Sequence, residues 1–213
     1  LYIGTHNRME KDIVPALGIK YEGLEIYGFS KTDILRDFKN IYLIKKAKDK
    51  CRKIMKEFKP DIVIGVGGYV TYPVISAAKS LGIKTFIHEQ NSVPGKSNIV
   101  LSKKVDLVGV SFDNSKSYFK NAKKVVYTGN PQGDSVHNLV PYSKRKFGLT
   151  EDKKLVLIVM GSLGSKTVNE VLENSLTKFD NSYEVLIVTG KNYYENYKQI
   201  KRNSNVFIEP FID

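Results

Sequence analysis

The sequence predicts an α/β protein with open parallel sheets, and three features lead to this prediction. Short apolar runs alternate with amphipathic segments of helical period along the chain. Glycines follow several of the apolar runs, as they do where a strand turns into a helix. A polar stretch near residues 140–154 interrupts the alternation once, and the same pattern then restarts.

In the first half, residues 1–4 predict a short strand and residues 23–29 are a second candidate. Residues 34–58 predict a helix with a break early in the span, and Pro60 ends it because proline cannot continue a helix. Apolar side chains recur there at helical spacing, at Ile41, Ile44, Ala47, Cys51, Ile54 and Phe58.

Residues 61–66 (DIVIGV) are typical of a buried parallel strand, because they are apolar after the first position and lead into glycines. A helix is expected over 72–82, with Pro73 in its first turn and Gly82 after its end. Strands are expected over 84–89, 106–112 and 123–131, with a short helix over 97–105.

In the second half, the pattern predicts a strand and glycine-rich turn over 155–165, a helix over 166–179, a strand over 183–190, a helix over 192–200 and a strand over 205–211. We therefore expect two Rossmann-like domains, residues 1–140 and 154–213, with residues 141–153 as a linker containing one short helix. Ligands of such sheets bind at the carboxyl ends of the strands.

The composition favours an anionic partner. Lys and Arg number 34 against 22 Asp and Glu, a net charge of +12, which suits nucleic acid, an anionic membrane or a phosphorylated ligand. The alternative is a set of solvated lysine faces. Cys51 is the only cysteine, so no intrachain disulfide or cysteine-based zinc site is possible, and no apolar run approaches the ~18 residues of a spanning helix.

Two glycine-rich turns are candidate phosphate sites. GVGGYVTYP (65–73) carries Gly65, Gly67 and Gly68, but its spacing is neither the dinucleotide fingerprint nor a P-loop. MGSLGS (160–165) offers the hydroxyl and N–H of Ser162. The alternatives are purely structural turns and, for the second, a helix cap by Ser162 or Ser165.

The loop FIHEQNSVPGKSN (86–98) concentrates hydrogen-bonding side chains after a predicted strand. Glu89 is suited to accept a proton or bind hydroxyl groups, Gln90 and Asn91 to read sugar hydroxyls, and His88 to do either. The alternative is a turn that satisfies its own polar groups. Asn130 and Pro131, after a later strand, are consistent with a simple turn.

Taken together, GVGGYVTYP, HEQNSVPGKSN, TGNP and MGSLGS resemble, in order and spacing, the MurG family of peptidoglycan glycosyltransferases. The resemblance covers nearly the whole chain, including the opening LYIGTHNRMEKDIVP. It implies a GT-B fold and transfer of N-acetylglucosamine from UDP-GlcNAc to lipid I, which gives lipid II. The implied reaction inverts the anomeric centre and uses no metal or cofactor.

The resemblance also implies roles for individual residues. The first domain would bind the acceptor lipid through Gly67, Gly68, Tyr69, His88, Glu89, Gln90 and Asn98. Donor contacts would come from Asn91, Asn130, Gly161, Ser162 and Gly164. The histidine proposed as general base in the family would lie upstream of Leu1, which leaves Glu89 and His88 as the candidates within this sequence.

The chain departs from the family pattern at several positions. Gln132 and Gly133 stand where an Arg near the donor phosphates is usual, and Met160 and Leu163 replace family residues of the donor loop. The nucleotide-reading segment would follow Asp213. We therefore expect a fragment that lacks both ends of the enzyme and is inactive alone.

A segment of mixed apolar and cationic residues is expected to dock on an anionic membrane, at the cytoplasmic face of the bacterial plasma membrane. Its members are Phe29, Lys31, Ile34, Leu35, Phe38, Lys39, Tyr42 and Lys46. The alternative is a core helix with a solvated lysine face, which is the interpretation we adopt for residues 47–58.

Other functions remain open alternatives. The chain could be a non-catalytic, acceptor-binding or membrane-anchoring subunit of a split GT-B transferase, although a donor loop at 160–165 argues against that. Nucleic-acid binding has only the charge in its favour, without a recognised motif, so no nucleic-acid partner is expected. The sequence does not indicate an oligomeric state.

Overall fold

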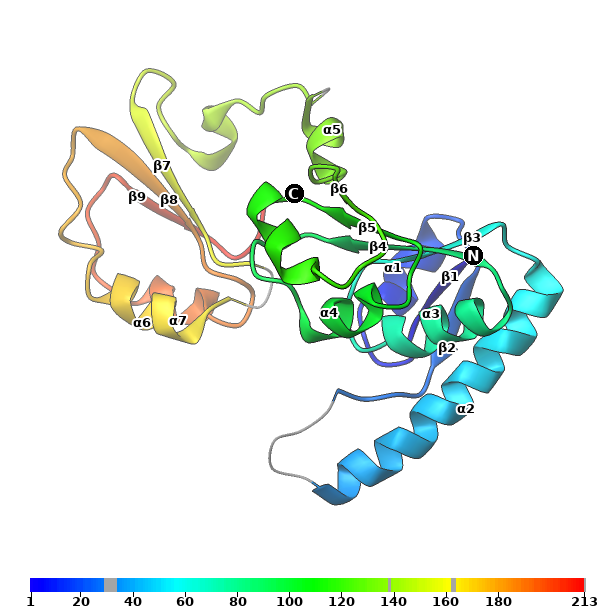
Figure 1. Ribbon diagram of the computed structural model, residues 1–213. Helices are drawn as coiled ribbons and strands as arrows, with labels where there is room; N and C mark the ends of the chain where they lie inside the picture. The colour runs from blue at the N-terminus through cyan, green and yellow to red at the C-terminus, as the bar shows by residue number, and fades with distance from the viewer. Residues whose placement is uncertain (29–33, 138, 162–163, 213) are drawn as a thin grey trace. The chain divides into compact units, whose positions relative to one another are not determined.

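The computed structural model describes residues 1–28, 34–137, 139–161 and 164–212, with the side chains of the long helix described from Asn40 onward. The chain divides into two compact units, Leu1–Asn138 and Leu139–Asp213. Each unit is an α/β layer built on parallel strands (Figure 1). No helix in the described ranges is long and apolar enough to cross a membrane.

The first unit contains two parallel sheets, ordered β1-β2 and β3-β4-β5-β6. Its elements in chain order are β1 (Tyr2–Thr5), α1 (Glu10–Ala16), β2 (Tyr21–Leu24), α2 (Ile34–Phe58), β3 (Ile62–Gly65), α3 (Thr71–Ser80), β4 (Lys84–Glu89), α4 (Lys96–Ser102), β5 (Leu107–Val110), the 3-10 helix η1 (Asp113–Phe119), β6 (Val125–Tyr127) and α5 (Gln132–His137). The second strand thus begins two residues before the predicted range, and α1, η1 and α5 were not predicted.

Helix α2 is one uninterrupted helix, so the prediction of an early break was wrong. The physical reason is that residues 34–58 contain neither glycine nor proline. Its buried face carries Leu43, Ala47, Cys51 and Met55, each one turn after the last. Ile41 and Phe58, which the spacing had placed with the apolar positions, are 55% and 52% exposed.

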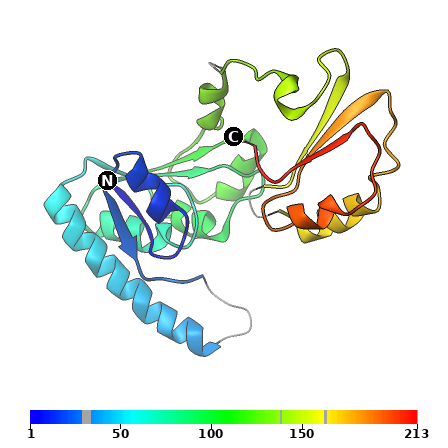
Figure 2. The same ribbon diagram turned by 180° about the vertical axis from the view of Figure 1, so that it is seen from behind.

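Helix α2 ends at Phe58, just before the proline that was predicted to stop it. The N–H of Lys59 donates to the Met55 carbonyl at 2.8 Å, and Lys59 has a positive φ of 51°. Pro60 follows directly and has no N–H to extend the helix. Figure 2 shows this helix as a long rod leading into the unit's parallel strands.

Strand β3 is an edge strand rather than the buried strand predicted from DIVIGV. It pairs only with β4 among the described residues, and Ile62 and Ile64 are 50% and 59% exposed. An apolar run predicts a strand, but it does not reveal whether both faces and both edges of that strand are covered.

Helix α3 links the two cores of the first unit. Val74, Ala77 and Ala78 pack with α2 and β2, whereas Ile75 packs in the cluster formed by Ile87, Leu101, Val105, Val108, Val110 and Phe119. The small alanines let α2 and α3 approach closely, and this contact fixes α3 above the sheet that carries the candidate site.

The carboxylate of Asp106 ties α3 to the start of β4. It accepts hydrogen bonds from the N–H and the hydroxyl of Thr85, both at 2.9 Å, and from Lys79 Nζ at 3.0 Å. Lys123 Nζ lies 3.3 Å away. The hydrogen bonds from Lys79 and Thr85 hold the pKa of Asp106 well below its usual range.

The second unit has the sheet order β7-β8-β9, all parallel. Its elements are the 3-10 helix η2 (Lys144–Phe147), β7 (Lys154–Val159), α6 (Lys166–Glu173), β8 (Tyr183–Val188), α7 (Tyr194–Lys198) and β9 (Val206–Glu209). Thr150 donates its N–H and hydroxyl to the Glu184 carboxylate at 2.8 and 2.7 Å. The end of the predicted linker is therefore attached to β8.

We expect Asp106→Asn to lower the free energy of unfolding by about 1 kcal/mol at neutral pH, because charge-assisted hydrogen bonds from Lys79 and Lys123 are lost. The folded pKa of Asp106 lies below the unfolded one. Its contribution is therefore present above the unfolded value of about 3.9 and disappears as pH falls through the folded pKa. Urea denaturation across pH measures this difference.

The matched control is Asp49→Asn, which removes only an exposed contact with Arg52 at 3.9 Å and is expected to change stability very little. Equal effects of the two substitutions, or an Asp106→Asn effect that persists in acid, would contradict the role given to the Asp106 carboxylate.

Candidate functional site

The candidate site lies at the carboxyl ends of β3 and β4, the edge where open parallel sheets bind ligands. A cavity of about 430 Å³ opens between the loop after β3 and the loop after β4. It is lined by Val66, Gly67, Gly68, Glu89, Gln90, Asn91, Gly95, Lys96, Ser97 and Asn98. The structure thus brings together the first glycine-rich turn and the polar loop that the sequence singled out.

Glu89, the last residue of β4, organises the polar loop. Its carboxylate is 1% exposed and accepts four hydrogen bonds. Oε1 accepts from the N–H and the side-chain amide of Asn91, and Oε2 accepts from the Gly95 N–H and from Asn98 Nδ2, all at 2.9 Å. The loop therefore folds around a single carboxylate.

The charge of Glu89 is stabilised by these donors. Burial raises the pKa of the carboxyl group, but the hydrogen bonds from Asn91, Asn98 and Gly95 together outweigh burial, so the pKa lies below its ordinary value. An ionised carboxylate whose oxygens each accept two hydrogen bonds is suited to holding the loop in place, and this arrangement favours positioning over proton transfer.

The turn after β3 presents backbone to the cavity. Gly67 and Gly68 have φ values of 95° and 75°, a region that favours glycine. The hydroxyl of Thr71 donates to the Gly67 carbonyl, and Gln90 Nε2 donates to the Val66 carbonyl at 3.1 Å. These bonds fix the turn, while a Cβ added at Gly68 would meet nothing within 4 Å.

Asn98 connects the two loops. It is 2% exposed, and its Nδ2 donates to the His88 carbonyl at 3.2 Å and to Glu89 at 2.9 Å. Its Oδ1 has no partner among the described residues. A Cβ added at Gly67 would lie 3.5 Å from Asn98 Nδ2, so the glycine turn and the buried amide are neighbours. The free acceptor is suited to a hydroxyl or amide donor of a ligand.

His88 is a buried connector, 4% exposed. Its Nε2 lies 3.1 Å from both the Thr128 hydroxyl and the Gly129 carbonyl. Because a carbonyl can only accept, this contact assigns the hydrogen to Nε2. His88 therefore holds the loop after β6 against the end of β4, and Ser111 donates to the same carbonyl at 3.3 Å.

Three predicted site residues of the first unit lie outside the cavity lining, namely His88, Tyr69 and Asn130. Tyr69 packs against the cluster formed by β2, α2 and α3. The Asn130 side chain accepts a hydrogen bond from the Gln132 N–H at 3.1 Å, which forms a turn at the start of α5.

Ser115, which the sequence analysis missed, is fully buried and donates to the carbonyls of Asn91 and Ser92 at 3.0 and 3.1 Å. The polar stretch SFDNSKS after a strand was the available signal.

In the second unit, Gly161 and Gly164 adopt positive φ values of 73° and 76°. A Cβ at Gly164 would lie 2.5 Å from the Thr189 carbonyl oxygen, so the backbone approach there requires glycine. Ser162 and Leu163 lie outside the described residues. Ser165 precedes α6 without a side-chain capping hydrogen bond.

No group of three His, Cys, Asp or Glu side chains in the described ranges could hold a metal ion.

Of the segment expected to meet a membrane, Phe29 and Lys31 lie outside the described residues, as do the side chains of Ile34, Leu35, Phe38 and Lys39. Tyr42 is 66% exposed on α2, and Lys46 is exposed as well. Ile41, Tyr42, Lys45 and Lys46 therefore combine exposed apolar and cationic side chains on one helix.

We expect Glu89→Gln to lower the free energy of unfolding by about 1–3 kcal/mol, because an amide NH₂ would face donors where a carboxylate oxygen accepted two bonds. The folded pKa is lowered, so the stabilisation exists above the unfolded value of about 4.3 and is lost as pH falls through the folded pKa. Glu57→Gln, at an exposed position of α2, is the control for urea denaturation.

Comparison with known proteins places these features in a family. A family model described as the glycosyltransferase family 28 N-terminal domain matches residues 1–110. Over its whole length the chain is 43% identical to a Bacillus licheniformis protein named UDP-N-acetylglucosamine--N-acetylmuramyl-(pentapeptide) pyrophosphoryl-undecaprenol N-acetylglucosamine transferase. It is 42% identical to a Bacillus cytotoxicus protein of the same name. The chain spans 59% and 60% of the lengths of these relatives.

Solved structures agree with this result. The crystal structure of Acinetobacter baumannii MurG matches with a TM-score of 0.67 and 29% identity, over 99% of this chain and 59% of that one. A UDP-GlcNAc 2-epimerase from Methanocaldococcus jannaschii matches with a TM-score of 0.61 and 13% identity, over 99% of this chain and 65% of that one, which shows likeness of fold alone. The α/β, Rossmann-like prediction and the resemblance to MurG are confirmed, and the chain belongs to glycosyltransferase family 28.

Proposed function

We propose that this chain forms the acceptor-binding domain, and the beginning of the donor-binding domain, of an enzyme that transfers N-acetylglucosamine from UDP-GlcNAc to lipid I. The product would be lipid II, a precursor of peptidoglycan. The observation that carries the proposal is the loop folded around Glu89, which faces a glycine turn across one cavity. The names of the Bacillus relatives support the same reaction.

The first unit would hold the acceptor. In this proposal the backbone at Gly67 and Gly68 faces the acceptor diphosphate, and the free Oδ1 of Asn98 accepts a hydrogen bond from a hydroxyl or amide group of the acceptor sugar. His88, Glu89 and Gln90 keep the two loops in place. A neutral amide beside backbone N–H groups suits a ligand that combines hydroxyls with phosphates.

The donor would contact Asn91 and Asn130 of the first unit and Gly161, Ser162 and Gly164 of the second. We propose an inverting displacement without a metal ion, in which a base takes the proton of the acceptor hydroxyl while donors stabilise the departing diphosphate. Glu89 and His88 are both engaged in fixed hydrogen bonds, so we do not assign the base to either of them.

In a protein extended to the length of its relatives, Asn91→Ala and Ser162→Ala should each lower kcat/KM by roughly tenfold, the effect of losing one hydrogen bond to a sugar or phosphate. The assay measures disaccharide formation from UDP-GlcNAc and a lipid I analogue. Asn121→Ala, at an exposed position away from both loops, is the control. Absence of transfer by the folded, extended wild type would refute the proposed reaction.

We also propose that the first unit docks on the cytoplasmic face of the plasma membrane through residues 29–46. The exposed Ile41 and Tyr42 beside Lys45 and Lys46 support this, because apolar side chains ringed by cations suit an anionic lipid surface. The acceptor is a lipid, so its binding domain must approach the bilayer.

Reversing Lys31, Lys39 and Lys46 to Glu should nearly abolish sedimentation with anionic vesicles, since each cation contributes about 1 kcal/mol near such a surface. Phe38→Ala should weaken binding to neutral vesicles, because it removes apolar area. The charge-matched control reverses the exposed Lys120, Lys178 and Lys201. Equal sedimentation of the two triple variants at low salt would show that overall charge, rather than this segment, drives binding.

A further inference from the structure

Lys96 is the single cationic side chain among the described residues that line the candidate cavity. It is exposed, and it makes neither a hydrogen bond nor an ion pair with the described part of the chain. Glu89 is the other charged residue of the lining, and four hydrogen bonds already enclose its carboxylate. The ammonium group of Lys96 is therefore free to contact a ligand.

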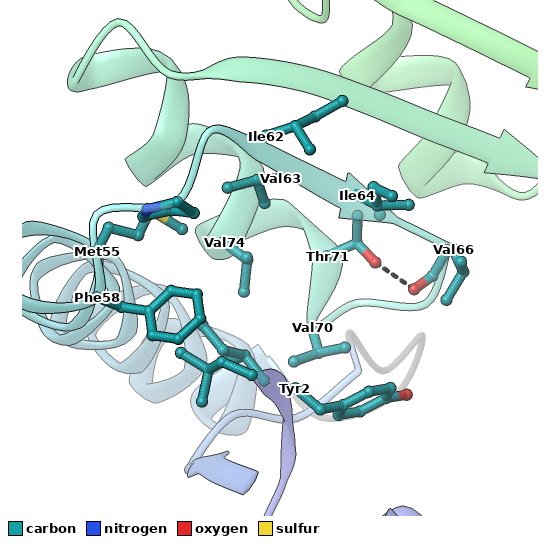
Figure 3. A pocket seen from close by; sticks show the side chains of 15 residues that line it. Tyr2, Met55, Phe58, Ile62, Val63, Ile64, Val66, Val70, Thr71 and Val74 are labelled. Atoms are coloured by element: carbon teal, nitrogen blue, oxygen red, sulfur yellow. Dashed lines mark hydrogen bonds between the residues drawn. The ribbon is translucent and has the colours of Figure 1, made fainter. Parts of the chain in front are cut away.

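The glycine turn across the cavity from Lys96 offers hydrogen-bond donors rather than acceptors. The Thr71 hydroxyl donates to the Gly67 carbonyl, the bond drawn as a dashed line in Figure 3, and Gln90 engages the Val66 carbonyl. The N–H groups of Gly67 and Gly68 make no hydrogen bond with the described residues. Free backbone N–H groups in such a turn favour an anionic ligand.

The buried charge of Glu89 makes a nearby cation important for any anion in this cavity. The pKa of Glu89 lies below its ordinary value, so the carboxylate is ionised at neutral pH and repels phosphate groups. Gly95 donates its N–H to this carboxylate at 2.9 Å, and Lys96 is the next residue in the chain. Lys96 is therefore placed to offset the charge of Glu89 for an anionic ligand.

We propose that Lys96 binds the diphosphate group of the acceptor together with the N–H groups of Gly67 and Gly68, an assignment that rests on the proposed function. The glycines contact one phosphate, and Lys96 and the hydroxyl of Ser97 contact the other, because the two sets of donors lie on different loops of one cavity. The free Oδ1 of Asn98 can only accept a hydrogen bond, so it faces the sugar rather than a phosphate.

Binding of inorganic diphosphate to the whole chain tests this role without the transfer reaction. The amide NMR signals of Gly67 and Gly68 are expected to shift to saturation. Orthophosphate should bind more weakly, since one phosphate does not reach both loops. Lys96→Met should weaken diphosphate binding by roughly tenfold, the effect of losing one charge-assisted hydrogen bond, and Lys96→Arg should retain most of the affinity.

The matched control is Lys103→Met, which removes the same charge at an exposed position that does not line the cavity. It is expected to leave the affinity for diphosphate nearly unchanged. Lys96 and Lys103 are both exposed, so both variants are expected to fold.

Kinetics in a protein extended to the length of its relatives separate the acceptor from the donor, which also carries a diphosphate. Lys96→Met should raise KM for a lipid I analogue by roughly tenfold and leave kcat and the KM for UDP-GlcNAc nearly unchanged, because the lost contact is with the bound acceptor. Lys96→Arg should restore most of the acceptor KM.

Four results would overturn the role of Lys96: equal losses of diphosphate affinity in Lys96→Met and Lys103→Met, unchanged affinity in Lys96→Met, no shift of the Gly67 and Gly68 signals, or a rise confined to the KM of the donor. Normal transfer by Lys96→Met would remove this role and leave the proposed reaction in place. An extended wild type that binds diphosphate through Lys96 but transfers no sugar would refute the reaction instead, and the anion site would stand.

Discussion

The buried carboxylate of Glu89 is the constraint on which the candidate site depends. A charge that is 1% exposed is tolerable only when hydrogen bonds replace water, and here four donors do so. Three of the four come from Asn91 and Asn98, and the last from the Gly95 backbone. Satisfying one group therefore determines the path of the chain from the end of β4 to the first turns of α4.

Further side-chain hydrogen bonds connect this loop to the segments that follow β5 and β6. Ser115, from the segment after β5, donates hydrogen bonds to the carbonyls of Asn91 and Ser92. His88 holds the loop after β6 through a hydrogen bond with the Gly129 carbonyl. The carboxyl ends of β4, β5 and β6 are thus connected by side-chain bonds as well as by the sheet. A site built this way can present a flat glycine backbone at Gly67 and Gly68 without depending on flexible side chains for its shape.

The sequence predicted those features of the fold that depend on residues close together in the chain. The alternation of apolar runs and helical segments predicted the α/β fold, and Pro60 and Gly82 marked helix ends that the structure contains. The concentration of polar residues at 88–98 predicted a binding loop, and Glu89, Gln90, Asn91 and Asn98 from this loop line one cavity with Gly67 and Gly68.

Sequence reasoning failed where the partner is distant in the chain. Ser115 binds carbonyls 23 and 24 residues away, and nothing near it in the sequence indicates them. Asn40, buried against both backbone groups of Tyr27, was missed for the same reason. DIVIGV was assigned to a buried strand because a run of apolar residues carries no information about which neighbours cover Ile62 and Ile64.

The bonds between Thr150 and Glu184 have a consequence for the segment that precedes β7. Ser143 caps η2, and Lys144 Nζ donates to the Glu151 carbonyl at 3.0 Å, so residues 143–151 hold together as one piece. Thr150 fastens that piece to β8. The segment that leads into β7 is therefore held by strand β8 of the second unit itself.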